Sequence, residues 1–236
     1  MTNTHYNKKY FKDRDNLNRP LAETINIFMK DHDLETAIDV GCGTGRLIHY
    51  LNNKNYKVKG CDLSKIAVKF ANRINNKNLC IVGSATKIPF KNNSFDLVIS
   101  DSVIEHLTKK EAKIFLKEAA RVLKPNGSIF LVTPNFATPI RLFHGLKWFG
   151  FSDPTHINFF TPIGLSCLLK TQKFSNIKWY FKTNTSIPFD LEFPLNPPFT
   201  FSKFPKPLKK LFIFLLFSTP LTIIRNSFWM SAQKTT

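Results

Sequence analysis

The sequence predicts an α/β fold with a doubly wound, mostly parallel seven-stranded sheet. Up to about residue 133, short apolar runs of strand length alternate with segments of helical periodicity. The connections between them are short, so successive strands are expected to lie parallel with helices on both faces. A glycine-rich loop, Gly41 to Gly45, directly follows the first apolar run. Such a loop lets a ligand lie against bare backbone amides at the end of a strand.

The first five strands are predicted from apolar runs. Their ranges are Thr36–Val40, Tyr56–Cys61 (closing at Asp62), Leu79–Val82, Phe95–Ser100 and Ser128–Thr133. The fourth is apolar almost throughout, as expected of a strand covered on both faces. Helices are predicted over about 20–31, from about Leu47, from Ser64 to about Ile74, and from Thr108 to about Leu123. Thr108 and Glu111 form a capping box, and Pro125-Asn126-Gly127 predicts a turn before the fifth strand.

The chain changes character beyond residue 133. Eleven of the fourteen prolines lie there, among many phenylalanines, which indicates irregular segments over an apolar surface. Thr161-Pro162 begins a helix, and the alternation of Ile177, Trp179 and Phe181 with polar residues predicts a sixth strand. Ser227–Lys234 is predicted as the seventh strand. Residues 185–226 then form a helical hydrophobic insertion between the last two strands of a single domain, residues 1–236.

The chain is strongly basic. Its formal net charge is +18 at pH 7, which attracts polyanions such as RNA or an anionic membrane surface. The basic residues are dispersed through a chain rich in Lys and Asn, so compositional drift is an equally good explanation. The hydrophobic content of 43% is that of a globular protein.

The four cysteines form no closely spaced pair. Cys42, Cys61, Cys80 and Cys167 are therefore expected to be reduced, and no metal site is expected. Reduced thiols, and an N-terminus without an apolar core and cleavage site, favour a cytoplasmic location.

Acidic residues end the first two strands. Asp39 precedes the glycine loop, and Asp62 closes the second strand at the offset where a carboxylate accepts both hydroxyls of a ribose. The alternative is that Asp62 is the first residue of a turn before a serine-capped helix. The loop does not fit G-x-G-x-x-G, because Arg46 stands at the third glycine position.

The pattern Asp-x-Gly-x-Gly-x-Gly resembles the first motif of class I S-adenosylmethionine-dependent methyltransferases. Later segments are similar to the successive motifs of the members that act in quinone biosynthesis and other small-molecule pathways. These segments are Gly83–Phe90, Asn93–Val98, Glu105–Leu107, Glu118–Gly127 and, further on, Asp153–Thr161. The resemblance spans roughly residues 35–135 and implies a Rossmann-like fold. It divides the chain into a cofactor-binding half, about 20–135, and an acceptor side, about 136–236.

The resemblance also implies a set of cofactor contacts. The loop residues in contact would be Asp39, Gly41, Gly43 and Gly45. Asp62 would hold the ribose hydroxyls, and the amide of Ala85 would contact the adenine. Ser84 stands where the family commonly has an aspartate for the adenine amine; its hydroxyl can still accept one hydrogen bond. Ser100 would line the methionine side of the pocket.

Two histidines are candidate catalytic residues. Methyl transfer needs alignment above all, which is worth up to about 7–11 kcal/mol in favourable models. An oxygen acceptor also needs a base, and His106 and His156 are the candidates because imidazole titrates near neutrality. His106 can equally be a helix-entry residue beneath the cofactor. Asp153 is primarily part of a turn signal.

An uncharged segment of fourteen residues lies between Lys210 and Arg225. As a helix it would reach about 21 Å, short of the roughly 30 Å hydrocarbon core of a bilayer. It either packs on the domain as a lid over the acceptor, or lies at a membrane interface. In the second case residues 203–225 make the contact, with the lysines near Lys206 facing anionic lipid at the inner face of the membrane.

The sequence therefore favours a methyltransferase that uses S-adenosylmethionine on a small, hydrophobic or lipid-linked acceptor. An RNA methyltransferase is the second reading, although the chain has no appended RNA-binding motif. A non-catalytic S-adenosylmethionine-binding module is the third. The glycine spacing disfavours a nicotinamide-linked oxidoreductase. The acceptor and the oligomeric state stay open.

Overall fold

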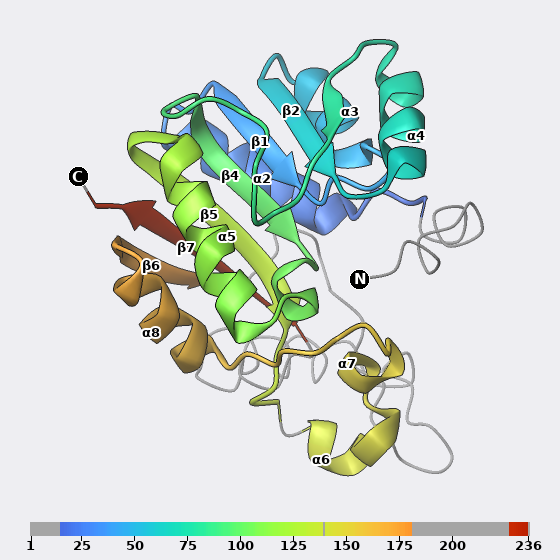
Figure 1. The fold of residues 1–236 in the computed structure, drawn as a ribbon, viewed down its shortest axis with the longest axis vertical. Helices are drawn as coiled ribbons and strands as arrows, with labels where there is room; N and C mark the ends of the chain where they lie inside the picture. The colour runs from blue at the N-terminus through green and yellow to red at the C-terminus, as the bar shows by residue number, and fades with distance from the viewer. Residues whose placement is uncertain (1–14, 139, 181–226, 236) are drawn as a thin grey trace, which may run out of the picture.

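The computed structural model describes residues 15–138, 140–180 and 227–235. They form a seven-stranded sheet of order β3-β2-β1-β4-β5-β7-β6 (Figure 1). The strands are β1 (Thr36–Val40), β2 (Lys57–Asp62), β3 (Cys80–Val82), β4 (Phe95–Asp101), β5 (Leu123–Pro134), β6 (Phe174–Tyr180) and β7 (Ser227–Lys234). β1 to β5 pair in parallel, and β7 lies antiparallel between β5 and β6. The predicted mostly parallel, seven-stranded fold is confirmed.

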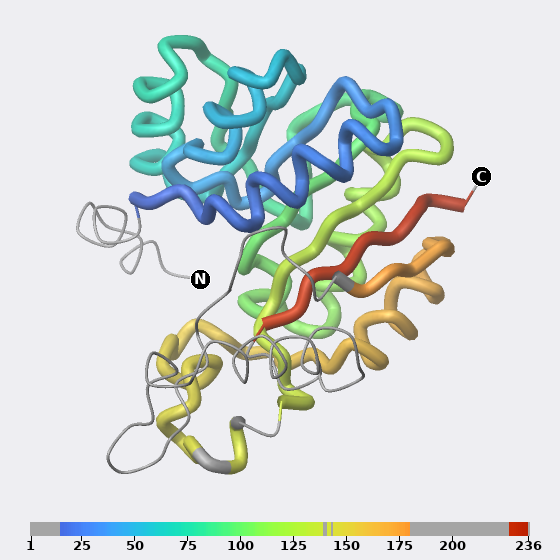
Figure 2. Tube along the Cα trace, turned by 180° about the vertical axis from the view of Figure 1, so that it is seen from behind, coloured from blue at the N-terminus to red at the C-terminus, as the bar shows by residue number. Residues whose placement is uncertain are grey.

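Helices cover both faces of the sheet. α2 (Arg19–Asp31), α3 (Arg46–Asn52) and α4 (Lys65–Asn75) contribute buried side chains to one core. α5 (Lys109–Val122) and α8 (Pro162–Thr171) contribute to the other. In Figure 1 α5 and α8 lie in front of the sheet and α2 lies behind it, and in Figure 2, seen from behind, α2 lies in front. The sheet is therefore doubly wound, as expected.

Side chains that alternate along the central strands supply both cores. Ile38, Val98 and Ile129 pack on the side of α5 and α8. Their sequence neighbours Leu97 and Phe130 pack on the side of α2. Because successive residues of a strand point to opposite faces, an apolar strand in this position fills two cores at once.

The helix starts follow the predicted caps. The Ser64 hydroxyl accepts a hydrogen bond from the amide of Ala67 at 3.3 Å. Thr108 Oγ1 accepts from the Glu111 amide at 3.2 Å, and Glu111 Oε2 accepts from the Thr108 amide at 2.9 Å. These bonds satisfy amides that have no partner inside a helix, which fixes where each helix begins.

The predicted turn at residues 125–127 lies inside β5. Leu123 already pairs with Phe95, and Ser128 pairs with Leu97, so β5 advances by more residues than β4 over this stretch. Asn126 has a φ of 61°, within the irregularity. The turn residues thus form a bulge in the strand, which is the usual way to hold extra residues in a ladder.

The acceptor side contains short helices between β5 and α8. They are α6 (Ile140–His144), η2 (Gly145–Lys147) and α7 (Phe149–Ser152), and they extend beyond the carboxyl ends of the parallel strands (Figure 1). β6 begins at Phe174, earlier than predicted. The expected insertion, 185–226, lies outside the described residues, as does the apolar segment with its lysines. In the part of the chain that is described, no helix has the length and hydropathy needed to cross a membrane.

The cysteines are free thiols, as expected. Cys42 in the glycine loop, Cys61 near the end of β2 and Cys80 at the start of β3 are buried, and Cys167 is exposed on α8. The three buried thiols behave as small core residues.

Candidate functional site

The glycine loop turns sharply between β1 and α3. The amides of Gly41 and Cys42 both donate to the carbonyl of Cys61, at 2.8 and 3.1 Å, and tie the loop to the end of β2. Gly41 has a φ of 80°, and a Cβ added there would overlap Cγ2 of Val103. Gly43 has a φ of 50°, and a Cβ added there would meet no atom within 4 Å. The protein's own packing therefore requires glycine at 41, whereas Gly43 leaves open space beside the loop.

The carboxylate of Asp62 supports that loop. Oδ2 accepts from the amide of Gly43 at 2.9 Å, and Oδ1 accepts from the amide of Ser64 at 2.8 Å. Burial raises the pKa of Asp62, and the two amides partly oppose this. The turn role considered for Asp62 is thus present, and the same carboxylate also lies in the wall of a cavity.

That cavity has a volume of about 720 Å³ and lies against the glycine loop and the ends of β2, β4 and β5. Five carboxyl groups line it, and none of its lining residues among those described is a lysine or arginine. The five are Asp62, Asp101, Glu105, Glu111 and Asp153. In a chain of net charge +18 this acidic lining is a local exception. Its field favours cations and disfavours phosphates.

Asp39 adds a further carboxyl group beside the glycine loop. It is buried and lines a smaller cavity of about 150 Å³ that also has Gly41, Gly43 and Asp101 in its wall. Burial raises the pKa of Asp39 to about 8, and the charges of Asp101 and Asp62 add to this. Burial raises the pKa of Asp101 as well. A positive charge bound beside these carboxyl groups would favour their ionised forms.

The cavity wall contains most of the predicted cofactor residues. Ser84 and Ala85 both line it. The Ser84 hydroxyl lies 2.8 Å from that of Thr86 and accepts from the Thr86 amide at 3.2 Å. Ser100 differs from the expectation, because it is buried and does not appear in the wall; its Oγ has no hydrogen-bond partner among the described residues. The lining begins one residue later, at Asp101, which the sequence reasoning missed.

The two candidate histidines lie together at the other end of the cavity. Their ring centroids are 4.8 Å apart. Nδ1 of His156 lies 2.8 Å from the carbonyl of Gly150 and therefore donates to it. Nδ1 of His106 lies 2.9 Å from Thr155 Oγ1, whose own proton goes to Asp153. Both rings are thus held in place through Nδ1 and line the cavity.

Asp153 forms the turn that its Asp-Pro sequence indicates. Its carboxylate accepts from the amide and the hydroxyl of Thr155. Although burial acts in the opposite direction, these bonds hold the pKa of Asp153 below its usual value. Asp153 therefore positions the Thr155 hydroxyl that contacts His106.

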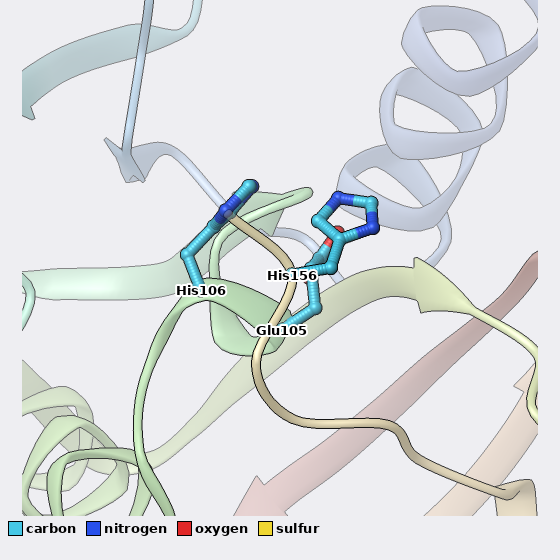
Figure 3. Close-up of side chains that lie close together, drawn as sticks. All are labelled: Glu105, His106 and His156. Atoms are coloured by element: carbon cyan, nitrogen blue, oxygen red, sulfur yellow. The ribbon is translucent and has the colours of Figure 1, made fainter. Parts of the chain in front are cut away.

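Glu105 completes this group. It is only 1% exposed, its Oε2 accepts from the Thr133 hydroxyl at 3.0 Å, and its Oε1 has no partner among the described residues. Burial raises its pKa to about 8. Figure 3 shows the two rings and the carboxyl group projecting to the same side of the two loops that carry them. Two sequence signals pointed to Glu105, its place in the Glu105–Leu107 segment that resembles a family motif and its position directly before a candidate histidine.

A cavity that attracts cations, placed against a glycine loop at the switch point of a parallel sheet, suits a sulfonium cofactor better than a dinucleotide. Fold and site together define the class of S-adenosylmethionine-dependent methyltransferases with a Rossmann-like fold. Residues 38–131 match the family model described as "Methyltransferase domain", and this match supports a class I methyltransferase of the type 11 group.

Named relatives and solved structures agree with this assignment. The chain is 30% identical over 148 residues to a malonyl-[acyl-carrier protein] O-methyltransferase of Hahella chejuensis (61% of this chain, 52% of the relative). It is 33% identical over 109 residues to a probable tRNA methyltransferase 9B of Mus musculus (45% and 24%). The chain thus spans about half the length of these relatives or less. A crystal structure of an Archaeoglobus fulgidus S-adenosylmethionine-dependent methyltransferase superposes with a TM-score of 0.61 at 16% identity. The superposition covers 90% of this chain and 94% of the other, which supports the fold.

Proposed function

We propose that this protein transfers a methyl group from S-adenosylmethionine to a small, apolar or lipid-linked acceptor. The observation that supports it most is the cavity at the glycine loop, with five carboxyl groups and, among its described lining residues, no lysine or arginine. A dinucleotide would bring two phosphates into this negative field. S-adenosylmethionine brings an ammonium and a sulfonium instead.

The residues present fit that cofactor. The Asp62 carboxylate accepts hydrogen bonds from two backbone amides and has further lone pairs that can accept from ribose hydroxyls. Gly43, which has no side chain, leaves space for the ribose beside this carboxylate. Asp39 and Asp101 place two carboxyl groups beside the loop, and a cation bound there would favour their ionised forms. When bound, S-adenosylmethionine supplies a methyl group already activated by its sulfonium.

His106 and His156 are the residues we assign to activating the acceptor. Both line the same cavity as Asp62 and Asp101, and their rings are held through Nδ1. Catalysis would otherwise consist of alignment and the exclusion of water, to which the strand ends and α7 contribute as walls of the cavity.

Apolar side chains on the short helices of the acceptor side support an apolar acceptor. Phe149 lines the cavity, and Leu142 and Leu146 on the neighbouring short helices are 74% and 90% exposed. Exposed apolar side chains of this kind favour contact with an apolar partner. We infer a cytoplasmic enzyme, which works at the inner face of a membrane where its acceptor is lipid-linked.

Calorimetry tests the cofactor assignment. In separate titrations we expect S-adenosylmethionine and S-adenosylhomocysteine each to bind with a stoichiometry of one per chain. We expect no binding of NAD at millimolar concentration. Asp62→Ala is expected to weaken both by about tenfold to a hundredfold, because a hydrogen bond to a charged group contributes about 1.5–3 kcal/mol. Glu35→Ala, at an exposed carboxylate before β1, is the matched control and should bind as the wild type does. A wild type that binds neither compound contradicts every methyltransferase reading, whereas binding without label transfer to any extract favours a non-catalytic module.

An RNA acceptor is the second candidate, favoured by the net charge of +18 and by the tRNA methyltransferase among the relatives. Methyl-labelled S-adenosylmethionine, incubated with separate membrane, RNA and small-molecule extracts, distinguishes the two. We expect label in the membrane or small-molecule fraction, with little change in rate between 50 and 200 mM salt. An RNA enzyme would label the RNA fraction and lose about 10³–10⁵ in affinity over that range if six to ten phosphates are contacted.

A further inference from the structure

We propose that Glu105, His106 and His156 form a binding site for one divalent transition-metal ion. The proposal rests on the positions of these three side chains and not on the methyl-transfer function. The site contains none of the cysteines, whose spacing predicts no metal site.

The three donor atoms already converge. One ligand atom from each residue lies within 4.8 Å of the other two. Ligands on a zinc ion with bonds of about 2.1 Å lie about 3.4 Å apart, so small rotations of the two rings would close the site. It is thus a nearly assembled site that an ion would draw together.

The backbone holds the two contributing loops in register. The carbonyl of Glu105 accepts hydrogen bonds from the amides of both Ile157 and Asn158, each at 3.0 Å. Glu105 and His106 lie in η1 (Ile104–His106) after β4, and His156 lies in the loop before α8. Because these bonds join the loops next to the donor atoms, the side chains need to move but the backbone does not.

The hydrogen bond of the His156 ring leaves its second nitrogen for a metal. Nδ1 of His156 donates to the Gly150 carbonyl, so its Nε2 carries the lone pair in the neutral ring. Nδ1 of His106 contacts Thr155, which Asp153 orients. Metal-binding histidines commonly donate their second nitrogen to a carbonyl or an oriented oxygen in this way.

Glu105 supplies the independent indication of a ligand. Its side chain is almost completely buried, and Oε1 has no hydrogen-bond partner among the described residues. A buried carboxyl oxygen without a partner costs free energy, and natural proteins rarely leave one. An ion bound between Oε1 and the two rings would satisfy it.

The donor set selects the class of ion. Two imidazoles and one carboxylate are ligands of Zn²⁺ and of similar transition-metal ions, whereas Mg²⁺ prefers oxygen ligands and retains water. Three protein ligands leave at least one coordination position of the ion free for another molecule. Because Glu105, His106 and His156 all line the large cavity, those positions face the space assigned to the acceptor. An ion there would lower the pKa of an acceptor hydroxyl that coordinates to it.

Zinc titration by calorimetry tests the site directly. Chelator-treated protein is titrated with Zn²⁺, and with Mg²⁺ in parallel, without any cofactor. We expect one Zn²⁺ per chain and much weaker Mg²⁺ binding. Glu105→Gln, which keeps an oxygen for the Thr133 hydroxyl, and His156→Asn should each weaken zinc binding at least about tenfold to a hundredfold. Circular dichroism establishes that each variant is folded, and the two variants remove different ligands.

The controls exclude binding elsewhere. His49 is exposed on α3 and Cys167 on α8, so His49→Asn and Cys167→Ser should bind zinc as the wild type does. Wild-type protein without a 1:1 site, or folded Glu105→Gln and His156→Asn proteins with unchanged affinity, would overturn the proposal. The same samples are titrated with S-adenosylmethionine. If the wild type binds zinc but not S-adenosylmethionine, the proposed function is contradicted and the metal site is still supported.

Discussion

Replacing Gly41 with alanine is expected to destabilise the fold by about 2–5 kcal/mol. At a φ of 80° a non-glycine residue costs about 1–2 kcal/mol. The added Cβ would also overlap Cγ2 of Val103, and overpacking of this kind costs about 1–3 kcal/mol. Because the amide of Gly41 donates to the Cys61 carbonyl, the displaced loop should also lose affinity for S-adenosylmethionine. Denaturant unfolding and calorimetry measure the two effects.

A second substitution separates the two causes. In Gly41→Ala with Val103→Ala the nearest atom to the new methyl group is Cβ of residue 103, 3.7 Å away, which is an ordinary contact. Relative to Val103→Ala alone, the stability loss should fall to about 1–2 kcal/mol, the backbone contribution only. Gly43→Ala, whose Cβ meets no atom within 4 Å, should show a similarly small loss of stability and still weaken cofactor binding. Equal stability of Gly41→Ala and the wild type, or no recovery in the double variant, would refute this account.

The parallel part of the sheet was predictable because its signals are local. Apolar runs, caps such as Thr108 with Glu111, and short connections each fix one element and agree with one another. The bulge in β5 was not predictable in the same way. Pro125 to Gly127 has the composition of a turn, but Leu123 pairs with Phe95 before it. Only the neighbouring strand decides whether such residues end a strand or interrupt it.

Most of the residues predicted to contact the cofactor line the large cavity, and their contact with a cofactor stays a prediction. Asp62 ends its strand and reaches the cavity, as expected. On β4 the expectation fell on Ser100, whereas Asp101 lines the cavity. Neighbouring residues of a strand point to opposite faces, so a shift of one residue changes which side chain reaches the ligand. The apolar run of β4 does not by itself show at which residue the strand ends.

The grouping of Glu105 with the two histidines depended on tertiary structure. His106 and His156 were candidates as separate residues, each because an imidazole near the acceptor can act as a base. The segments that carry them are joined by hydrogen bonds from the amides of Ile157 and Asn158 to the carbonyl of Glu105. Contacts between two irregular loops have no periodicity, so the sequence has no signal for them.

The affinity for S-adenosylmethionine is expected to rise steeply with pH up to about pH 8. Burial raises the pKa of Asp39 to about 8 in the protein alone, so this carboxyl is protonated at neutral pH. A bound cation favours the ionised form, and binding below pH 8 therefore expels a proton. By linkage the affinity should increase about fiftyfold between pH 6 and pH 8 and then level off. Calorimetry in buffers of different ionisation enthalpy counts the released protons, near one at pH 6.5 and near zero above pH 9.

Asp39→Asn identifies the group that releases the proton. The variant should bind more weakly at pH 8, with an affinity that changes little with pH. Without ligand, the folded pKa of Asp39 lies above its ordinary value of 3.8, so the wild type loses stability as pH rises from about 4 to about 8. The variant should lack that loss and be the more stable protein at pH 8. A full pH dependence of binding in Asp39→Asn would assign the proton to Asp62 or Asp101, whose pKa values burial also raises. Affinity independent of pH in the wild type would contradict the placement of a cation beside these carboxyl groups.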